Sequence, residues 1–149
     1  MLAEETRPRS MLSANGLLLT LRGINSNPEA GPEDMVAVRM WSDGTRIITT
    51  RRRRLQAASE LSQAIEKGAG PRNAGEFVES LTDRMVERMV DIIDDISDQV
   101  DELEEAVLTM ESYELRPKIA QLRRHTIGPR HYLAPQREAV ARLFSENVE

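Results

Sequence analysis

The first half of the chain carries short apolar runs separated by turn-forming residues, a pattern that predicts β-strands. The run from Leu17 to Ile24 is almost continuously apolar, as in buried strands. A loop rich in Asn, Pro and Gly separates it from a second run, Met35 to Trp41. Asp43-Gly44 then predicts a tight hairpin in which both residues can take positive φ, with Arg46 to Thr50 as the return strand. Residues 1–15 show no sustained period, and we expect them to enter as a loop.

From residue 55 onward the period of the pattern becomes that of an α-helix. Residues 55–68 form a short amphipathic segment, with Leu61 and Ile65 expected to face inward. Gly68 is expected to end this helix, because glycine readily adopts the left-handed conformation that follows a helix.

A much longer helix is expected to begin at Asn73, which is followed three residues later by Glu76 as in a capping box. It should continue to about Glu111, and at roughly 55 Å it would protrude from a small domain. Its apolar residues recur every eleven positions, which predicts a nearly straight seam. The series are Val78, Met89 and Val100; Leu81, Ile92 and Leu103; and Met85, Ile96 and Val107.

A second apolar stripe on this helix consists of Val86, Val90 and Ile93. It widens the apolar face only in the first half of the helix. We therefore expect the first half to pack against the sheet and the second half to contact a single neighbour.

The expected neighbour is a basic helix that returns after a reversal at residues 112–115. Its apolar stripe is Leu115, Ile119 and Leu122, and its basic residues are Arg116, Lys118, Arg123 and Arg124. Pro117 fits only near the first turn of this helix, and Gly128-Pro129 is expected to interrupt it. A terminal helix then resumes, with Pro135 at its start or at a kink.

These elements predict an α/β (α+β) fold with a small, mostly antiparallel sheet of about three strands packed on helices. A long antiparallel helical hairpin protrudes from it. We expect a single domain over residues 1–149, with a strand-rich region at 1–73, the acidic and basic helices at 74–127, and a truncated terminal helix at 128–149.

Composition narrows the function classes. The 149 residues contain no cysteine and two histidines, which excludes thiolate sites and disfavours a histidine-rich metal centre. His125 and His131 are six residues apart across the Gly-Pro break, so surface or hinge roles are expected. Aromatic residues make up 3% of the chain, which counts against a protein that stacks bases on its side chains. No nucleophile, phosphate-loop or dinucleotide motif is present, and we predict no enzymatic activity and no cofactor.

The net charge of −5 conceals a strong asymmetry along the chain. Residues 74–112 hold 13 acidic and 2 basic residues, whereas the flanking segments each carry a balance of +3. Within the acidic segment, spacings of four, three and four residues place four carboxylates on one helix face: Asp94, Asp98, Asp101 and Glu105. One interpretation is pairing with the basic helix and screening by salt. The other is weak attraction of hard divalent cations, for which oxygen ligands suit magnesium better than zinc.

Four consecutive arginines, Arg51 to Arg54, follow the last predicted strand. We expect them to be solvated or paired with carboxylates, with Glu4 and Glu5 as candidates. A contact with nucleic acid or anionic lipid is the alternative.

Taken in order, the segments resemble the cytosolic domain of CorA-type divalent-cation transporters. The similarity covers nearly the whole chain and is greatest for the zinc-transporting ZntB branch. The segments that carry it are AEETRPR, GLLLTLRGIN, NPEAGPEDMVAVRMWSDGTRIITTRRRRL, GAGPRNAGEFVESLTDRMVERM, DELEEAV and YLAPQREAVARL.

The resemblance implies the cytosolic funnel domain of a homopentameric transporter in the bacterial inner membrane, which attracts or senses zinc or magnesium. The Gly-Met-Asn pore signature and the membrane helices of that family are absent from these residues, so we expect a fragment that cannot conduct ions by itself and touches the membrane only through absent segments. We expect no nucleic-acid partner. The rival hypotheses are a nucleic-acid-binding module that uses Arg51 to Arg54 and a stand-alone structural or adaptor protein.

Overall fold

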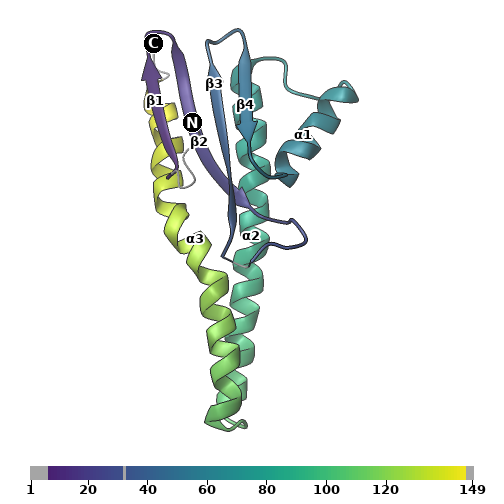
Figure 1. The fold of residues 1–149 in the computed structure, drawn as a ribbon, viewed down its shortest axis with the longest axis vertical. Helices are drawn as coiled ribbons and strands as arrows, with labels where there is room; N and C mark the ends of the chain where they lie inside the picture. Colours follow the sequence, from purple (N-terminus) through teal and green to yellow (C-terminus); the bar gives the residue numbers. More distant parts are fainter. Residues whose placement is uncertain (1–6, 32, 147–149) are drawn as a thin grey trace.

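The computed structural model describes residues 7–31 and 33–146, and Figure 1 shows a sheet at one end of a long helical hairpin. The fold is α+β, as the sequence predicts. Its elements are β1 (Arg9–Ser13), β2 (Gly16–Ile24), β3 (Met35–Ser42), β4 (Ile47–Arg51), α1 (Gln56–Glu66), α2 (Ala74–Val107) and α3 (Ser112–Glu146).

The strands form an antiparallel sheet in the order β1-β2-β3-β4. The three predicted strands are confirmed, but the expected loop at residues 1–15 is wrong over Arg9–Ser13, which forms β1. The pattern did not reveal β1 because its two large apolar side chains, Met11 and Leu12, are exposed and it is held mainly by pairing with β2. Residues 1–6 lie outside the described part of the chain.

The β3–β4 hairpin differs in detail from the expected tight turn. Only Gly44 has positive φ, at 88°, and β4 begins at Ile47 instead of Arg46. The Asp43 carboxylate organises the turn by accepting hydrogen bonds from the backbone N–H groups of Thr45 at 3.0 Å and Arg46 at 2.8 Å.

The core lies between one sheet face and the helices. Pairing of Leu19 with Met40 and of Leu21 with Val38 places four buried side chains on that face. The helices contribute Leu61, Leu81, Met85 and Ala139 to the same cluster. Each large apolar side chain buried there contributes about 1.5–3 kcal/mol to folding.

Helix α2 begins as its sequence predicts. The Asn73 side chain accepts a hydrogen bond from the Glu76 backbone N–H at 2.9 Å. The Glu76 carboxylate accepts from the Arg72 backbone N–H at 2.8 Å, one residue earlier than in a standard capping box. The helix ends at Val107, four residues before the expected end.

The predicted apolar seam of α2 is confirmed where the helix packs on the sheet, because Leu81, Met85 and Met89 are buried there. The second stripe is not: Val86, Val90 and Ile93 are 45–49% exposed, so their expected packing against the sheet is wrong. Helix α2 contacts the sheet along one narrow line, and the side of α2 that carries these three residues points away from the sheet. A similar correction applies to α1, where Leu61 is buried but Ile65 is 46% exposed.

Helix α3 continues through Gly128-Pro129, so the expected interruption is wrong. Proline removes one backbone hydrogen bond from a helix, yet this helix continues, and both residues are buried. A Cβ at Gly128 would lie 2.6 Å from the Glu33 carbonyl oxygen. The missing side chain therefore lets the loop between β2 and β3 lie directly against α3.

A second contact joins α3 to β2 where β1 has ended. The buried Gln136 accepts a hydrogen bond from the Arg22 backbone N–H at 2.7 Å. Its amide also contacts the Met89 sulfur at 3.8 Å. Gln136 therefore replaces a strand partner at the sheet edge and ties β2, α2 and α3 together.

Candidate functional site

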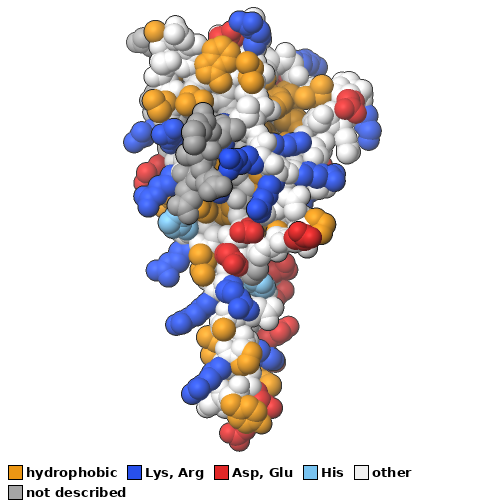
Figure 2. All heavy atoms as spheres, in the orientation of Figure 1, with side chains coloured by type: hydrophobic (Ala, Val, Ile, Leu, Met, Phe, Trp, Pro, Cys, Tyr) orange, Lys and Arg blue, Asp and Glu red, His pale blue; other side chains and the backbone are white. Residues whose placement is uncertain are grey.

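The acidic and basic helices form the predicted antiparallel hairpin. They lie side by side at the tip and diverge toward the sheet, so the lower half of α2 has α3 as its neighbour (Figure 1). Figure 2 shows blue side chains mainly along the α3 side of this hairpin and red side chains mainly along the α2 side. The charge asymmetry of the sequence is therefore an asymmetry across the hairpin.

The four carboxylates predicted to share a face of α2 do so, and all are exposed: Asp94, Asp98, Asp101 and Glu105. The side of α2 that faces α3 is marked by Gln99, whose side-chain oxygen lies 3.2 Å from the Nδ1 atom of His125. At about 100° of rotation per residue, Asp101 is about 200° from Gln99. We call these four residues the acidic face; it points away from α3.

The structure shows how the acidic face relates to the basic helix. Among the described residues of α2 and α3, no ion pair within 4.0 Å joins the helices. Carboxylates about 6 Å apart along a helix repel each other by only about 0.7 kcal/mol in water, and salt reduces this further. The face is thus stable without local partners and leaves its carboxylates open to mobile cations.

The acidic face does not form a closed metal site. Across the described residues, no three His, Asp or Glu side chains are placed to hold one ion together. The acidic face lacks the converging oxygens that give tight, dehydrated coordination.

The two histidines occupy different surroundings. His125 lies partly buried between the helices through its contact with Gln99, and His131 is exposed with its ring edge-on to Tyr132 at 4.7 Å. They do not come together.

The arginine run leaves the sheet at the end of β4, and all four residues are exposed. Arg53 pairs with Asp34 at 3.7 Å, and the Arg54 carbonyl accepts a hydrogen bond from Asn27 at 3.0 Å. The proposed partners Glu4 and Glu5 lie outside the described residues. Sequence reasoning did not connect this run with Arg22 and Arg39, which only the strand register brings near it.

In the described part of the chain, none of the helices combines the length and apolar character required to cross a bilayer.

Known proteins resemble this chain in both sequence and structure. The chain is 42% identical over 149 residues to the divalent cation transporter CmaX of Pseudomonas aeruginosa, covering 96% of this chain and 44% of that protein. The structure of full-length CmaX matches with a TM-score of 0.82 over 95% of this chain and 44% of that one. The ZntB cytoplasmic domain from Vibrio parahaemolyticus matches with a TM-score of 0.75 and 25% identity over 99% of this chain and 58% of that one.

The chain thus spans less than half of CmaX, and its identity to CmaX exceeds its identity to ZntB. The family described as CorA-like Mg²⁺ transporter protein matches residues 1–149. Because that match covers the whole chain, the protein belongs to the CorA-like transporter family.

Proposed function

We propose that this chain is the cytoplasmic domain of a divalent-cation transporter at the bacterial inner membrane. The observation that carries the proposal is the family match over all 149 residues. The 42% identity to CmaX, described as a divalent cation transporter, supports it. The family is one of transporters, so membership also confirms the prediction of a non-enzymatic chain.

Within that function, we propose that the acidic face raises the local concentration of divalent cations near the transporter. Its four exposed carboxylates point into solvent, and the basic helix lies on the opposite side of α2. Binding should be weak, on the order of millimolar, because the oxygens are spread along the helix and the ion keeps its water.

Magnesium and zinc are the two ions to compare. Oxygen-only ligands favour magnesium. The resemblance to the ZntB branch implies zinc, and we propose a place in that branch on the 25% identity to the ZntB cytoplasmic domain. We further propose that copies of the chain assemble into a homopentamer, as the family resemblance implies.

The acidic face is tested by titrating Mg²⁺, Zn²⁺ and the paramagnetic probe Mn²⁺ into the chain while following NMR line broadening. The variant carries Asp94→Asn, Asp98→Asn, Asp101→Asn and Glu105→Gln. A matched control with equal net charge carries Glu29→Gln, Glu66→Gln, Glu79→Gln and Glu138→Gln, all at exposed positions elsewhere. We expect broadening centred on α2 that only the first variant loses; equal binding by all three proteins would exclude the face from this role.

Transport itself is tested in a chimera in which this chain replaces the matching residues of CmaX. Cation uptake by the chimera, measured in vesicles, should be close to that of CmaX if the domain serves the same purpose. A chimera that inserts and assembles but transports nothing would contradict the proposed function.

A further inference from the structure

Helix α3 carries an exposed face on which arginines alternate with isoleucines. Its residues recur at spacings of three, four, four and three positions, which places them in one line along the helix. They are Arg116, Ile119, Arg123, Ile127 and Arg130, and all five are exposed. We call this line the basic face. At about 100° per residue, Arg123 lies about 160° from His125, whose ring contacts Gln99 of α2, so the basic face points away from α2.

The charges of the basic face are not balanced within the chain. None of Arg116, Arg123 and Arg130 forms an ion pair within 4.0 Å with another described residue. In Figure 2, blue and orange side chains lie next to one another along the α3 side of the hairpin. Ile119 is 43% exposed and Ile127 is 55% exposed, so the face offers apolar surface as well as positive charge. Arginine and exposed apolar surface are both characteristic of protein interfaces.

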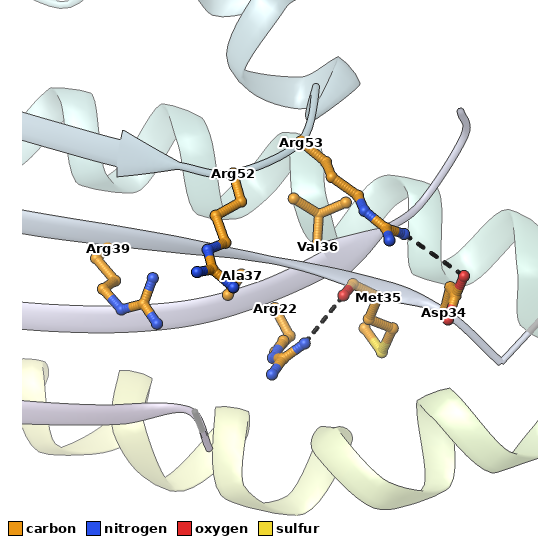
Figure 3. Close-up of a pocket in the computed structure, with 8 residues that line it drawn as sticks. All are labelled: Arg22, Asp34, Met35, Val36, Ala37, Arg39, Arg52 and Arg53. Atoms are coloured by element: carbon orange, nitrogen blue, oxygen red, sulfur yellow. Dashed lines mark hydrogen bonds and ion pairs between the residues drawn. The ribbon is translucent and has the colours of Figure 1, made fainter. Parts of the chain in front are cut away.

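The arginines near the sheet offer no comparable surface, because they already have partners. Arg22 is 7% exposed and donates a hydrogen bond to the Met35 carbonyl at 3.0 Å. Arg53 pairs with Asp34 at 3.7 Å (Figure 3). The two remaining arginines labelled in Figure 3 also interact within the chain. The basic face of α3 is therefore the more open of the two basic surfaces.

Helix α2 carries a complementary surface on the other side of the hairpin. Val90, at the centre of the second apolar stripe and 49% exposed, lies about 180° around the helix from Gln99 and so directly opposite α3. Two carboxylates of the acidic face, Asp94 and Asp101, lie within about 40° of Val90. We call the stripe together with these two carboxylates the outer face of α2. It presents acidic and apolar groups, as the basic face presents basic and apolar groups.

The two faces also match in height along the hairpin. Because the helices are antiparallel (Figure 1), each step toward the tip along α2 corresponds to one step back along α3, counted from the contact of His125 with α2. Asp101 is therefore level with Arg123. Asp94 is level with Arg130. A rotation about an axis parallel to the hairpin keeps these heights unchanged, so it can bring the two carboxylates of one copy to the two arginines of the next.

We propose that the outer face of α2 in one copy of the chain binds the basic face of α3 in a second copy. The contact pairs Asp101 with Arg123 and Asp94 with Arg130, and it covers the apolar stripe of α2. Two different faces that meet in this way form a heterologous interface, which closes into a ring under rotation. The inference rests on the proposed homopentamer and adds the two faces through which its copies meet.

Charge favours a second copy over other occupants of these faces. Two copies that met through identical faces would bring like charges together on α2 or on α3, which disfavours both symmetric dimers. A polyanion such as nucleic acid would be attracted by α3 but repelled by the acidic helix beside it. A second copy satisfies both faces at once. Asp98 and Glu105 lie further round α2 than the contact, so they stay open to cations.

Charge reversal tests the pairing, with the average mass measured by light scattering over a concentration series at fixed ionic strength. The α2 variant carries Asp94→Lys and Asp101→Lys, and the α3 variant carries Arg123→Glu and Arg130→Glu. We expect the wild-type chain to associate and each variant to associate at least about tenfold more weakly, because attraction at two positions becomes repulsion. Mixing the two variants in equal amounts should restore association, since the reversed faces complement each other.

Matched controls reverse the same number of exposed charges elsewhere. They are Glu29→Lys with Glu66→Lys for the α2 variant, and Lys67→Glu with Arg72→Glu for the α3 variant. Both controls should associate like the wild type. Equal weakening in a control and its matched variant would overturn the proposal, because net charge and not the pairing of faces would then govern association.

Circular dichroism checks that the variants are folded, and the single reversals Asp101→Lys and Arg123→Glu give the same comparison if a double variant is not. A mixture that associates no better than its two components would overturn the pairing of faces, but not the homopentamer itself. Absence of association by the wild-type chain would also overturn the proposal. Cation uptake by the CmaX chimera is measured independently, so failure of this contact is distinguishable from failure of the proposed transport function.

Discussion

Single residues decide how the loops meet the helices in this fold, and Gly128 is the clearest case. Glycine within a helix costs about 1 kcal/mol relative to alanine, so Gly128 is unfavourable by propensity alone. Glycine fits here because a Cβ atom at this position would lie 2.6 Å from the Glu33 carbonyl oxygen. That oxygen belongs to the backbone and not to a flexible side chain. Close approach of the loop outweighs helix propensity.

Substitution of Gly128 by alanine should therefore destabilise the chain, in the direction opposite to helix propensity. The added methyl group must displace the Glu33 backbone, and overpacking of this kind costs about 1–3 kcal/mol. Urea denaturation of wild-type and Gly128→Ala protein measures the difference. An increase in unfolding free energy would show that the β2–β3 loop yields without cost and that the contact does not constrain α3.

At the scale of elements, the β3–β4 hairpin depends on one carboxylate. Hydrogen bonds from the backbone N–H groups of Arg46 and Thr45, assisted by the Arg46 guanidinium, hold the pKa of Asp43 below its ordinary value of about 3.9. A depressed pKa in the folded chain means that ionised Asp43 stabilises the fold. This stabilisation is complete above the unfolded-state pKa and is lost as the pH falls through the lower folded-state pKa.

The variant Asp43→Asn should flatten that part of the pH dependence. We expect the difference in melting temperature between wild type and variant to be constant from pH 5 to 8 and to shrink as the pH is lowered below about 4. Thermal unfolding at a series of pH values measures it. A difference that persists undiminished at the lowest pH at which the chain is folded would mean that shape, and not charge, makes Asp43 suit the turn.

The elements also show how far the sequence could predict the structure. Periodicity located three strands and the long helices, because their apolar faces are buried. It missed β1, whose apolar side chains are exposed, and it misplaced the stripe on α2, because period alone does not say how wide a contact is. The proline rule wrongly ended a helix at residue 128, because a local rule does not include tertiary packing, and Gly128 and Pro129 are both buried.

The candidate sites also differ in how far the sequence could predict them. The acidic face is contained in the spacing of residues on one helix and could be predicted, although its direction relative to α3 could not. The grouping of Arg22 and Arg39 near the arginine run depends on the pairing of Arg22 with Ala37, a non-local register, so the sequence showed only the four consecutive arginines beside it. Alternation on β2 and β3 would have indicated it once that register was known.

At the scale of the whole molecule, the exposure of Val86, Val90 and Ile93 bears on how copies of the chain meet. Half-exposed apolar residues on consecutive turns of α2 form a continuous stripe beside the acidic face, and contiguous exposed apolar surface is typical of interfaces. The proposed homopentamer requires contacts between copies, and this stripe is one exposed apolar surface of α2 that can supply them.

We therefore expect the chain to self-associate with increasing concentration, and the triple variant Val86→Gln, Val90→Gln and Ile93→Gln to remain monomeric. Its melting temperature should change little, because these side chains are 45–49% exposed and glutamine is a good helix former. Light scattering over a concentration series measures the mass. The control Met11→Gln with Ile48→Gln removes comparably exposed apolar groups from the sheet, and it should associate like the wild type. Loss of association in the control alone would move the contact between copies to the sheet, and association of the triple variant at wild-type strength would exclude the stripe on α2.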